Sequence, residues 1–368
     1  MTPALPPDPS PDAAQRSPAE PPDASGVWAV GVDGGGTRGR AWAAPTSHAG
    51  ASRPAGTATV ERSCNPYAVG VEAAAASLLA LLDDAWRQGA GPADGLSRAF
   101  VTIGLAGVDR DAERRAMTTA LVAGGLAADR LELVGDPWIA LEGALPATDA
   151  PSAYDEAPPT VRVLLVAGTG SVAVGVTGAV RVRVGGWGSR VGDEGSGAWL
   201  GIEAVRAALR ACDGRDPDGA LARAVQGTWG AGVDALVGRA RTATPAEFAA
   251  LAPLVLEHAA ADPTARSLRD GAVAYLAELV ATVATALERT GGRPPNAIAL
   301  AGGVATALEE PIGAALTASL RTVVRRAVGE PVAGAWSLAR ARALASESGI
   351  GVEVEDRAGH DPQGRTTI

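Results

Sequence analysis

The sequence predicts an α/β protein made of two similar halves, and three observations carry that prediction. Short apolar runs typical of buried strands alternate with segments of helical spacing along most of the chain. A length of 368 residues favours two domains over one. A strand, a turn rich in glycine and hydroxyl residues, and a second strand occur in that order twice, which suggests an internal duplication. At an offset of 134 positions, Gly34, Gly36 and Thr37 fall on Gly168, Gly170 and Ser171.

The first half follows a Pro-, Asp- and Ala-rich segment, residues 1–25, which we expect to be disordered. A Pro- and Ala-rich stretch at 150–160 is the expected domain boundary, so the first domain is placed at 26–149. Within it we expect strands at 27–32, 38–44, 100–105 and 131–134, and helices at 71–86 and 110–123.

The second half begins with another strand, turn and strand. Here we expect strands at 161–166, 172–176 and 297–300, a helix at 198–211, a largely helical region to about residue 290 and a last helix near 336–345. We place the second domain at 160–335, a C-terminal helix at 336–346 and a mobile tail at 347–368.

The composition excludes several classes of function. A formal charge of −9, with no basic tail or stripe, argues against nucleic acid or an anionic membrane as partner. The chain has no lysine, which removes Schiff-base chemistry and a P-loop. Two cysteines, Cys64 and Cys212, exclude a disulfide framework or a cysteine zinc site. His48, His258 and His360 show no ligand spacing, and we interpret them as incidental.

The location inside the cell is predicted from two absences. No stretch reaches the apolar length that spans a bilayer, and the N-terminus lacks a basic region followed by an apolar core. We therefore expect a cytoplasmic protein.

The turn from Asp33 to Thr37 is the first candidate phosphate site. Glycines at 34, 35 and 36 let backbone N–H groups approach a phosphate closely, and the Thr37 hydroxyl adds a donor. Asp33 at the strand end is placed to hold Mg²⁺, through water. A plain glycine-rich hairpin turn is the alternative interpretation.

A second turn of the same kind follows the first strand of the second half. Gly168, Thr169, Gly170 and Ser171 could face the first turn across a cleft and hold one triphosphate from both sides. A third turn, Gly302-Gly303, also ends a strand and could accept adenine and ribose, although it fits a turn leading into a helix equally well.

Asp136 is the candidate general base. It follows a strand directly, and its carboxylate could take the proton of a sugar hydroxyl that attacks a γ-phosphate. The alternative is structural, because Asp at an N-cap with Pro137 at the first helical position is a standard helix start.

A glycine-rich segment at 185–197 is the candidate sugar site. So many glycines raise the entropy cost of folding, which a purely structural loop has little reason to bear. Asp193 can form bidentate hydrogen bonds to sugar hydroxyls. Alternatively, Asp193 and Glu194 only favour the N-terminus of the following helix.

Taken together, these motifs give the chain a resemblance to a known family. It resembles the N-acetylglucosamine kinase-like branch of the actin and hexokinase superfamily, also called the BadF/BadG/BcrA/BcrD ATPase type. The resemblance spans residues 27–345 and rests on the motifs at 33–37, 65–66, 104–107, 136, 168–171, 186–188, 192–197 and 302–304.

The resemblance implies two ribonuclease-H-like (actin-like ATPase) domains around a central cleft, with ATP and Mg²⁺ as cofactors. It implies that Thr37 and Thr169 touch the phosphates, that Asp33 serves Mg²⁺ and that Asp136 activates the 6-hydroxyl of an amino sugar. It further implies a homodimer and domain closure that excludes water. The residues implied in sugar binding are Asn65, Gly107, Asp136, Gly186, Trp187, Gly188 and Asp193.

Three functions remain open at this point. Phosphorylation of N-acetylglucosamine is the first, with glucosamine or N-acetylmuramic acid as other acceptors. A sugar sensor without turnover is the second, although the N-terminal tail is too short for a helix-turn-helix. An activase with a shared 4Fe–4S cluster is the third, and the placement of Cys64 and Cys212 in different halves argues against it.

Overall fold

The computed structural model describes residues 26–36, 38–48, 53–54, 56–93, 95–108, 110–146, 160–291 and 293–347. The predicted N-terminal tail, residues 348–368 of the predicted C-terminal tail, and nearly all of the predicted domain boundary lie outside these residues. So does Thr37.

The first domain is built on a mixed five-stranded sheet with the order β3-β2-β1-β4-β5. Strand β1 pairs antiparallel with β2 and parallel with β4, which pairs parallel with β5. The strands are β1 (Trp28–Gly34), β2 (Gly39–Pro45), β3 (Gly56–Val60), β4 (Phe100–Leu105) and β5 (Leu131–Gly135). The helices are α1 (Pro66–Val69), α2 (Val71–Gln88), η1 (Leu96–Arg98), α3 (Asp111–Ala123) and α4 (Asp136–Ala144).

The second domain repeats this order in its sheet β8-β7-β6-β9, and one parallel bridge between Ile298 and Val324 stands where a fifth strand would lie. The strands are β6 (Val161–Ala167), β7 (Ser171–Thr177), β8 (Val180–Gly185) and β9 (Ala297–Ala301). The helices are α5 (Gly197–Cys212), α6 (Ala220–Trp229), α7 (Val233–Ala240), α8 (Pro245–Ala249), α9 (Ala252–His258), α10 (Pro263–Gly291), α11 (Gly303–Ala307), α12 (Glu309–Ala315) and α13 (Ala318–Arg321).

The predicted α/β class and two-domain architecture are confirmed. The pairs β1–β2 and β6–β7 are the two predicted strand, turn and strand units, and both sheets place them identically. The third strand of each sheet, β3 and β8, was not predicted. Both are short, and β8 alternates Val and Arg with only its last residue buried.

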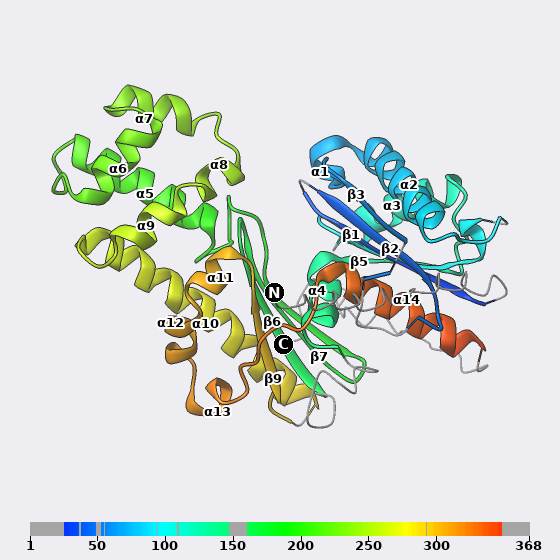
Figure 1. Ribbon diagram of the computed structural model, residues 1–368. Coiled ribbons are helices and arrows are strands. Elements are labelled where there is room, and N and C mark those ends of the chain that lie inside the picture. Colours follow the sequence, from blue (N-terminus) through cyan, green and yellow to red (C-terminus); the bar gives the residue numbers. More distant parts are fainter. Residues whose placement is uncertain are drawn as a thin grey trace, which may run out of the picture.

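The last helix begins earlier than predicted. Helix α14 (Pro331–Glu347) starts five positions before Trp336, and the helix-starting signal of Pro331 was missed. Although it follows the second domain in sequence, α14 lies against the first sheet beside α4 (Figure 1). The contact is intimate, since a Cβ on Gly31 of β1 would lie 2.1 Å from the backbone nitrogen of Trp336.

Helix α4 lies between the two sheets, and α14 covers the same face of the first sheet beside it. Helices α2 and α3 cover the other face of the first sheet, and α4 also packs on the second sheet through a shared apolar cluster. The cluster joins Leu141, Ala144 and Leu145 to Leu164, Val172, Val174, Ala297 and Ala299. Helix α4 therefore touches both domains.

Helix α10 contradicts the expectation that no stretch reaches membrane-spanning length. By length and composition alone, its 29 residues qualify as a candidate span. Its apolar face forms the core of the second domain, where Leu276, Val280, Val283 and Leu287 are fully buried. That burial accounts for the composition.

Candidate active site

Asp33 and Asp136 lie at the same edge of the first sheet. In the parallel register, Asp33 stands beside Gly104 of β4, and Gly104 stands beside Val134 of β5. Asp136 follows β5 directly. Because neighbouring strands lie about 4.8 Å apart and Asp136 is two residues beyond Val134, the backbones of Asp33 and Asp136 are roughly 12 Å apart. Carboxyl ends of parallel strands are where ligands bind in such sheets.

Asp33 is a half-buried acid next to cations. Burial raises the pKa of its carboxyl, while Arg40 and Arg38 oppose that shift. Arg40 lies directly across the β1–β2 pair from Asp33, and its guanidinium donates to Glu330 over 3.0 Å. A desolvated carboxylate at a strand end fits Mg²⁺, which takes one or two carboxylates and keeps several waters.

The first glycine turn is hydrogen-bonded to the segment that precedes Asn65 and to the residue that follows β4. The backbone N–H of Cys64 donates to the carbonyl of Gly35 over 3.1 Å, and that of Ala106 donates to Gly34 over 3.5 Å. Cys64 itself is fully buried. The turn, the segment before Asn65 and the end of β4 therefore form one continuous surface.

Asn65 and Gly107 meet at the rim of this surface. Asn65 is the N-cap of α1, and its Oδ1 accepts a hydrogen bond from the Tyr67 backbone over 2.9 Å. A Cβ on Gly107, which has a φ of 88°, would lie 2.9 Å from that Oδ1 and 2.7 Å from the Tyr67 ring. Only glycine fits there, and the structure brings Asn65 and Gly107 together. Their role in sugar binding remains a prediction.

Asp136 does not cap its helix. Gly135 is the N-cap of α4, Asp136 is its first residue, and Pro137 follows. The capping interpretation was wrong because Gly135 adopts the extended conformation, with φ −63° and ψ 146°, which the N-cap requires. Asp136 is half-buried and still favours the helix N-terminus through its charge.

The second turn is held by the start of α5. The N–H groups of Gly197 and Ala198 donate to the carbonyls of Gly168 and Thr169 over 2.8 and 3.1 Å. Within the turn, Gly168 donates to Gly170 over 2.9 Å. The first two donors of α5 are therefore used to fix the turn, and the positive end of a 16-residue helix lies behind it.

Asp193 lies against the second turn. Its Oδ1 accepts a hydrogen bond from Gly188 over 3.1 Å, and a Cβ on Gly170 would lie 2.7 Å from its Oδ2. Burial raises the pKa of this carboxyl. Asp193 has a φ of 60°, a strained conformation for a residue other than glycine, and such strain gathers at functional sites.

Trp187 stands out from the loop that Asp193 anchors. Gly186 and Gly188 on either side have φ values of 72° and 91°, which only glycine adopts at no cost. The Trp187 side chain between them is 61% exposed. An exposed indole on a loop hydrogen-bonded to Asp193 can contact a ligand.

Gly302 brings the third turn against the second. With a φ of 91°, it approaches so closely that a Cβ would lie 2.4 Å from the carbonyl oxygen of Ala167 and 3.1 Å from the nitrogen of Gly168. Gly303 begins α11, so the interpretation as a turn leading into a helix is confirmed. Contact with a nucleotide there remains a prediction.

A polar network at the rim near Asn65 was not predicted from the sequence. The Tyr67 hydroxyl donates to Oε1 of Glu113 over 2.6 Å, and Arg110 donates to the same hydroxyl over 3.4 Å. This hydrogen bond raises the pKa of Tyr67 and lowers that of Glu113. The three residues come from separate segments, so no local pattern announces them.

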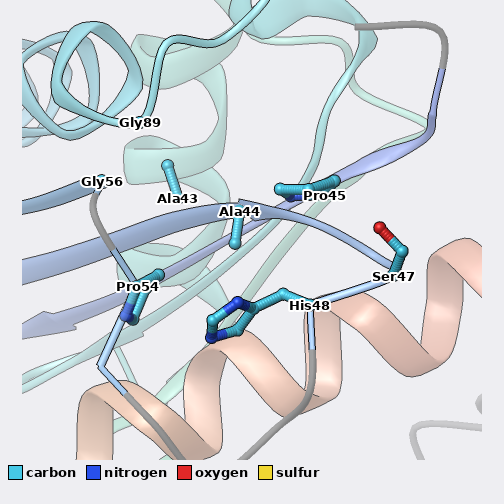
Figure 2. A pocket seen from close by; sticks show the side chains of 8 residues that line it. All are labelled: Ala43, Ala44, Pro45, Ser47, His48, Pro54, Gly56 and Gly89. Carbon is cyan, nitrogen blue, oxygen red and sulfur yellow. The ribbon is translucent and has the colours of Figure 1, made fainter. Parts of the chain in front are cut away.

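A separate cavity of about 240 Å³ lies far from these residues, at the other end of β2 (Figure 2). Pro45 at this end pairs with Trp28 at the start of β1, whereas Asp33 is near the end of β1. Its lining is Ala43, Ala44, Pro45, Ser47, His48, Pro54, Gly56 and Gly89. The residues that were predicted for catalysis take no part in it.

The fold and the paired turns define the class of this protein: two actin-like domains, each with a hairpin turn at the carboxyl end of its central strand. Comparison with known sequences then gives the family. The profile of the BadF/BadG/BcrA/BcrD ATPase family matches residues 30–336, and the chain belongs to that family.

Individual relatives carry kinase names. The chain is 32% identical over 106 residues to a glucosamine kinase of Vibrio cholerae, covering 28% of this chain and 36% of that one. It is 33% identical over 116 residues to an N-acetylmuramic acid/N-acetylglucosamine kinase of Clostridium acetobutylicum, covering 31% and 34%. The alignments thus span about a third of these curated relatives.

One solved structure is similar over nearly its whole length. A putative N-acetylglucosamine kinase from Chromobacterium violaceum shares 29% identity at a TM-score of 0.66, covering 86% of this chain and 99% of that one. Another, from Porphyromonas gingivalis, shares 20% identity at a TM-score of 0.54, which shows the fold alone.

Proposed function

We propose that this protein transfers the γ-phosphate of ATP to the 6-hydroxyl of an amino sugar, with N-acetylglucosamine as the first candidate acceptor. Glucosamine is the alternative acceptor within the same chemistry, and N-acetylmuramic acid is a third. The family and the kinase-named relatives support this reaction class.

The observation that best supports this proposal is that Asp33 and Asp136 lie at the same edge of the first sheet. The first glycine turn follows Asp33 directly. In the proposed reaction, the Asp136 carboxylate accepts the proton of the 6-hydroxyl as that oxygen attacks phosphorus. Asp33 would hold Mg²⁺ through water, and Mg²⁺ would offset the charge of the phosphates. Asn65, Gly107, Gly188 and Asp193 would orient the sugar.

The nucleotide would lie between the two domains. Residues 34–37 of the first turn and 168–171 of the second would surround the phosphates, and Gly302 with Gly303 would pack on adenine and ribose. The chain has no lysine, and backbone amides, hydroxyls and Mg²⁺ would do this work.

An acceptor panel tests the reaction. ADP release is measured by a coupled assay with N-acetylglucosamine, glucosamine, N-acetylmuramic acid and glucose. We expect an amino sugar to give the highest kcat/KM. Failure of all four acceptors, with sugar binding retained in calorimetry, would favour the sugar sensor.

Asp136→Asn tests the base. Asparagine keeps the size and the helix position but cannot take a proton, so we expect kcat to fall about 10²- to 10⁴-fold. Sugar affinity, measured by calorimetry, should stay within about twofold because the side chain still accepts a hydrogen bond. Turnover equal to that of the parent would refute the assignment.

The activase alternative has no support in the cysteine positions. Cys64 is buried beside the first turn, and Cys212 is exposed at the end of α5 in the other domain. A shared cluster needs suitably placed thiolates in each chain.

We further propose that the protein is a homodimer and that it is cytoplasmic. Sedimentation equilibrium of the full chain would test the dimer.

A further inference from the structure

A buried ion pair joins the two domains. Arg162 of β6 donates to Oε2 of Glu142 on α4 over 2.7 Å, and the two side chains are only 10% and 8% exposed. The same guanidinium group also donates to the backbone carbonyl of Leu145, just past the end of α4. The pair thus ties the first domain to the central strand of the second.

Stability does not explain why a charged pair occupies this place. Removing two charges from water is expensive, and well-packed apolar residues of similar volume are often as stabilising or more so. The surrounding interface is itself apolar, since Leu141 and Leu145 pack against Leu164 and Val174. Such packing is non-directional, whereas hydrogen bonds to a guanidinium fix distance and angle.

Each member of the pair lies on an element that leads to part of the proposed site: α4 begins with the proposed base, and β6 ends at the second phosphate turn. Glu142 is six residues after Asp136 on the same helix, a rise of about 9 Å. Arg162 lies on β6, whose last residue, Ala167, leads into the second turn about 17 Å away. The pair is therefore where the helix of the base and the strand of the phosphate turn are fastened together.

We propose that the Glu142–Arg162 pair is a positioning device that sets the Asp136 carboxylate in register with the second phosphate turn across the cleft. Neither residue touches substrate. The proposal rests on the proposed kinase function for its role in turnover, but the coupling itself can be measured without chemistry.

The decisive variant is the apolar double replacement Glu142→Leu with Arg162→Met. It leaves no unpaired charge, so we expect the melting temperature to stay within about 4 °C of the parent. We expect kcat to fall about 10- to 100-fold, since misplacement of a reacting group by about 1 Å can cost that much. The KM values for ATP and sugar should change less than about threefold. A double variant with the parent's kcat overturns the proposal.

The matched control is an exposed ion pair in the second domain. Arg210 binds Asp216 over 2.6 and 2.9 Å, with both side chains more than 30% exposed, and Arg210→Met with Asp216→Leu should leave kcat unchanged. Arg162→Lys, which keeps a charge but not the fork, should be intermediate. Loss of kcat in the control as well would show a general effect of charge removal and overturn the proposal.

A second readout separates this proposal from the kinase function. If the parent phosphorylates none of the sugars, the kinase proposal fails, and amide hydrogen exchange tests the pair instead. With a non-hydrolysable ATP analogue bound, we expect added protection over residues 136–146 in the parent and little in the double variant. Equal protection in both proteins overturns the proposal.

Discussion

At the scale of single residues, the candidate site contains two acids, Asp33 and Asp193, whose burial disfavours the charged form. The pKa values of Asp33 and Asp193 are both raised by desolvation. For an acid whose folded pKa lies above its unfolded value, ionisation weakens the fold at neutral pH. The penalty disappears as pH falls below the folded pKa toward the unfolded one. Such cost is common at functional positions.

Asp33→Asn should therefore stabilise the protein without Mg²⁺ at pH 7 while abolishing Mg²⁺-dependent turnover. The gain in melting temperature should shrink in acid, because the parent's carboxyl is then protonated. Addition of Mg²⁺ with nucleotide should raise the melting temperature of the parent more than that of the variant. Thermal melts at two pH values, with and without Mg²⁺, check this. A variant less stable than the parent at pH 7 would contradict it.

Single residues also show how much of the candidate site could be predicted from the sequence. Asp33, Asp136 and Asp193 could be singled out from the sequence because each lies at the end of a strand or within a glycine-rich segment. The long-range side-chain pairs could not be predicted in this way. Tyr67 binds Glu113 and Glu142 binds Arg162, and the two members of each pair are far apart in the sequence. Local pattern carries no information on such pairs.

At the scale of elements, α10 is organised by one buried acid. Asp262 precedes the helix and accepts hydrogen bonds from Thr264 over 2.8 Å, Ala265 over 3.1 Å and Leu221 of α6 over 3.0 Å. Desolvation raises its pKa, yet these backbone donors together outweigh it, and the pKa is lowered. One side chain thus fastens two helices.

Asp262→Ala should lower the free energy of unfolding by about 2–3 kcal/mol, because it removes a cap and leaves buried donors unpaired. Since the folded pKa is lowered, the stabilisation is present above the unfolded pKa and is lost as pH falls through the folded one. Urea denaturation at neutral and acid pH measures both effects. Asp270→Ala, an exposed position on the same helix, should change stability by less than about 0.5 kcal/mol.

At the scale of the whole molecule, the duplication could be predicted from the sequence, but the packing of the last helix on the first domain could not. The two glycine turns predicted two equivalent sheets, and the strand orders confirm this. That α14 crosses back to the first sheet could not be predicted. Its helical pattern shows apolar faces but not which surface they cover.

The crossing of α4 and α14 depends on glycine. A Cβ on Gly334 would lie 2.0 Å from the carbonyl of Ile139 and 2.4 Å from the nitrogen of Gly143, both in backbone that cannot give way easily. We expect Gly334→Ala to lower the free energy of unfolding by about 2–3 kcal/mol or more, as overpacking does.

The control is Gly313→Ala on helix α12, where a Cβ would meet nothing within 4 Å. Alanine there should be neutral or stabilise by up to about 1 kcal/mol through helix propensity. Thermal and urea unfolding of both variants compares them. Equal stability of the two would show that the helices can separate to admit a methyl group.

The return of α14 to the first sheet has a consequence for biosynthesis. Domains generally fold as units while the ribosome delivers the chain from its N-terminus. Here the part of the first sheet around Ala29, Trp42 and Ala44 stays uncovered on one face until residues 331–347 emerge, after the whole second domain has been made. The domain that is translated first is thus the one completed last, and its apolar strand face must be shielded until then.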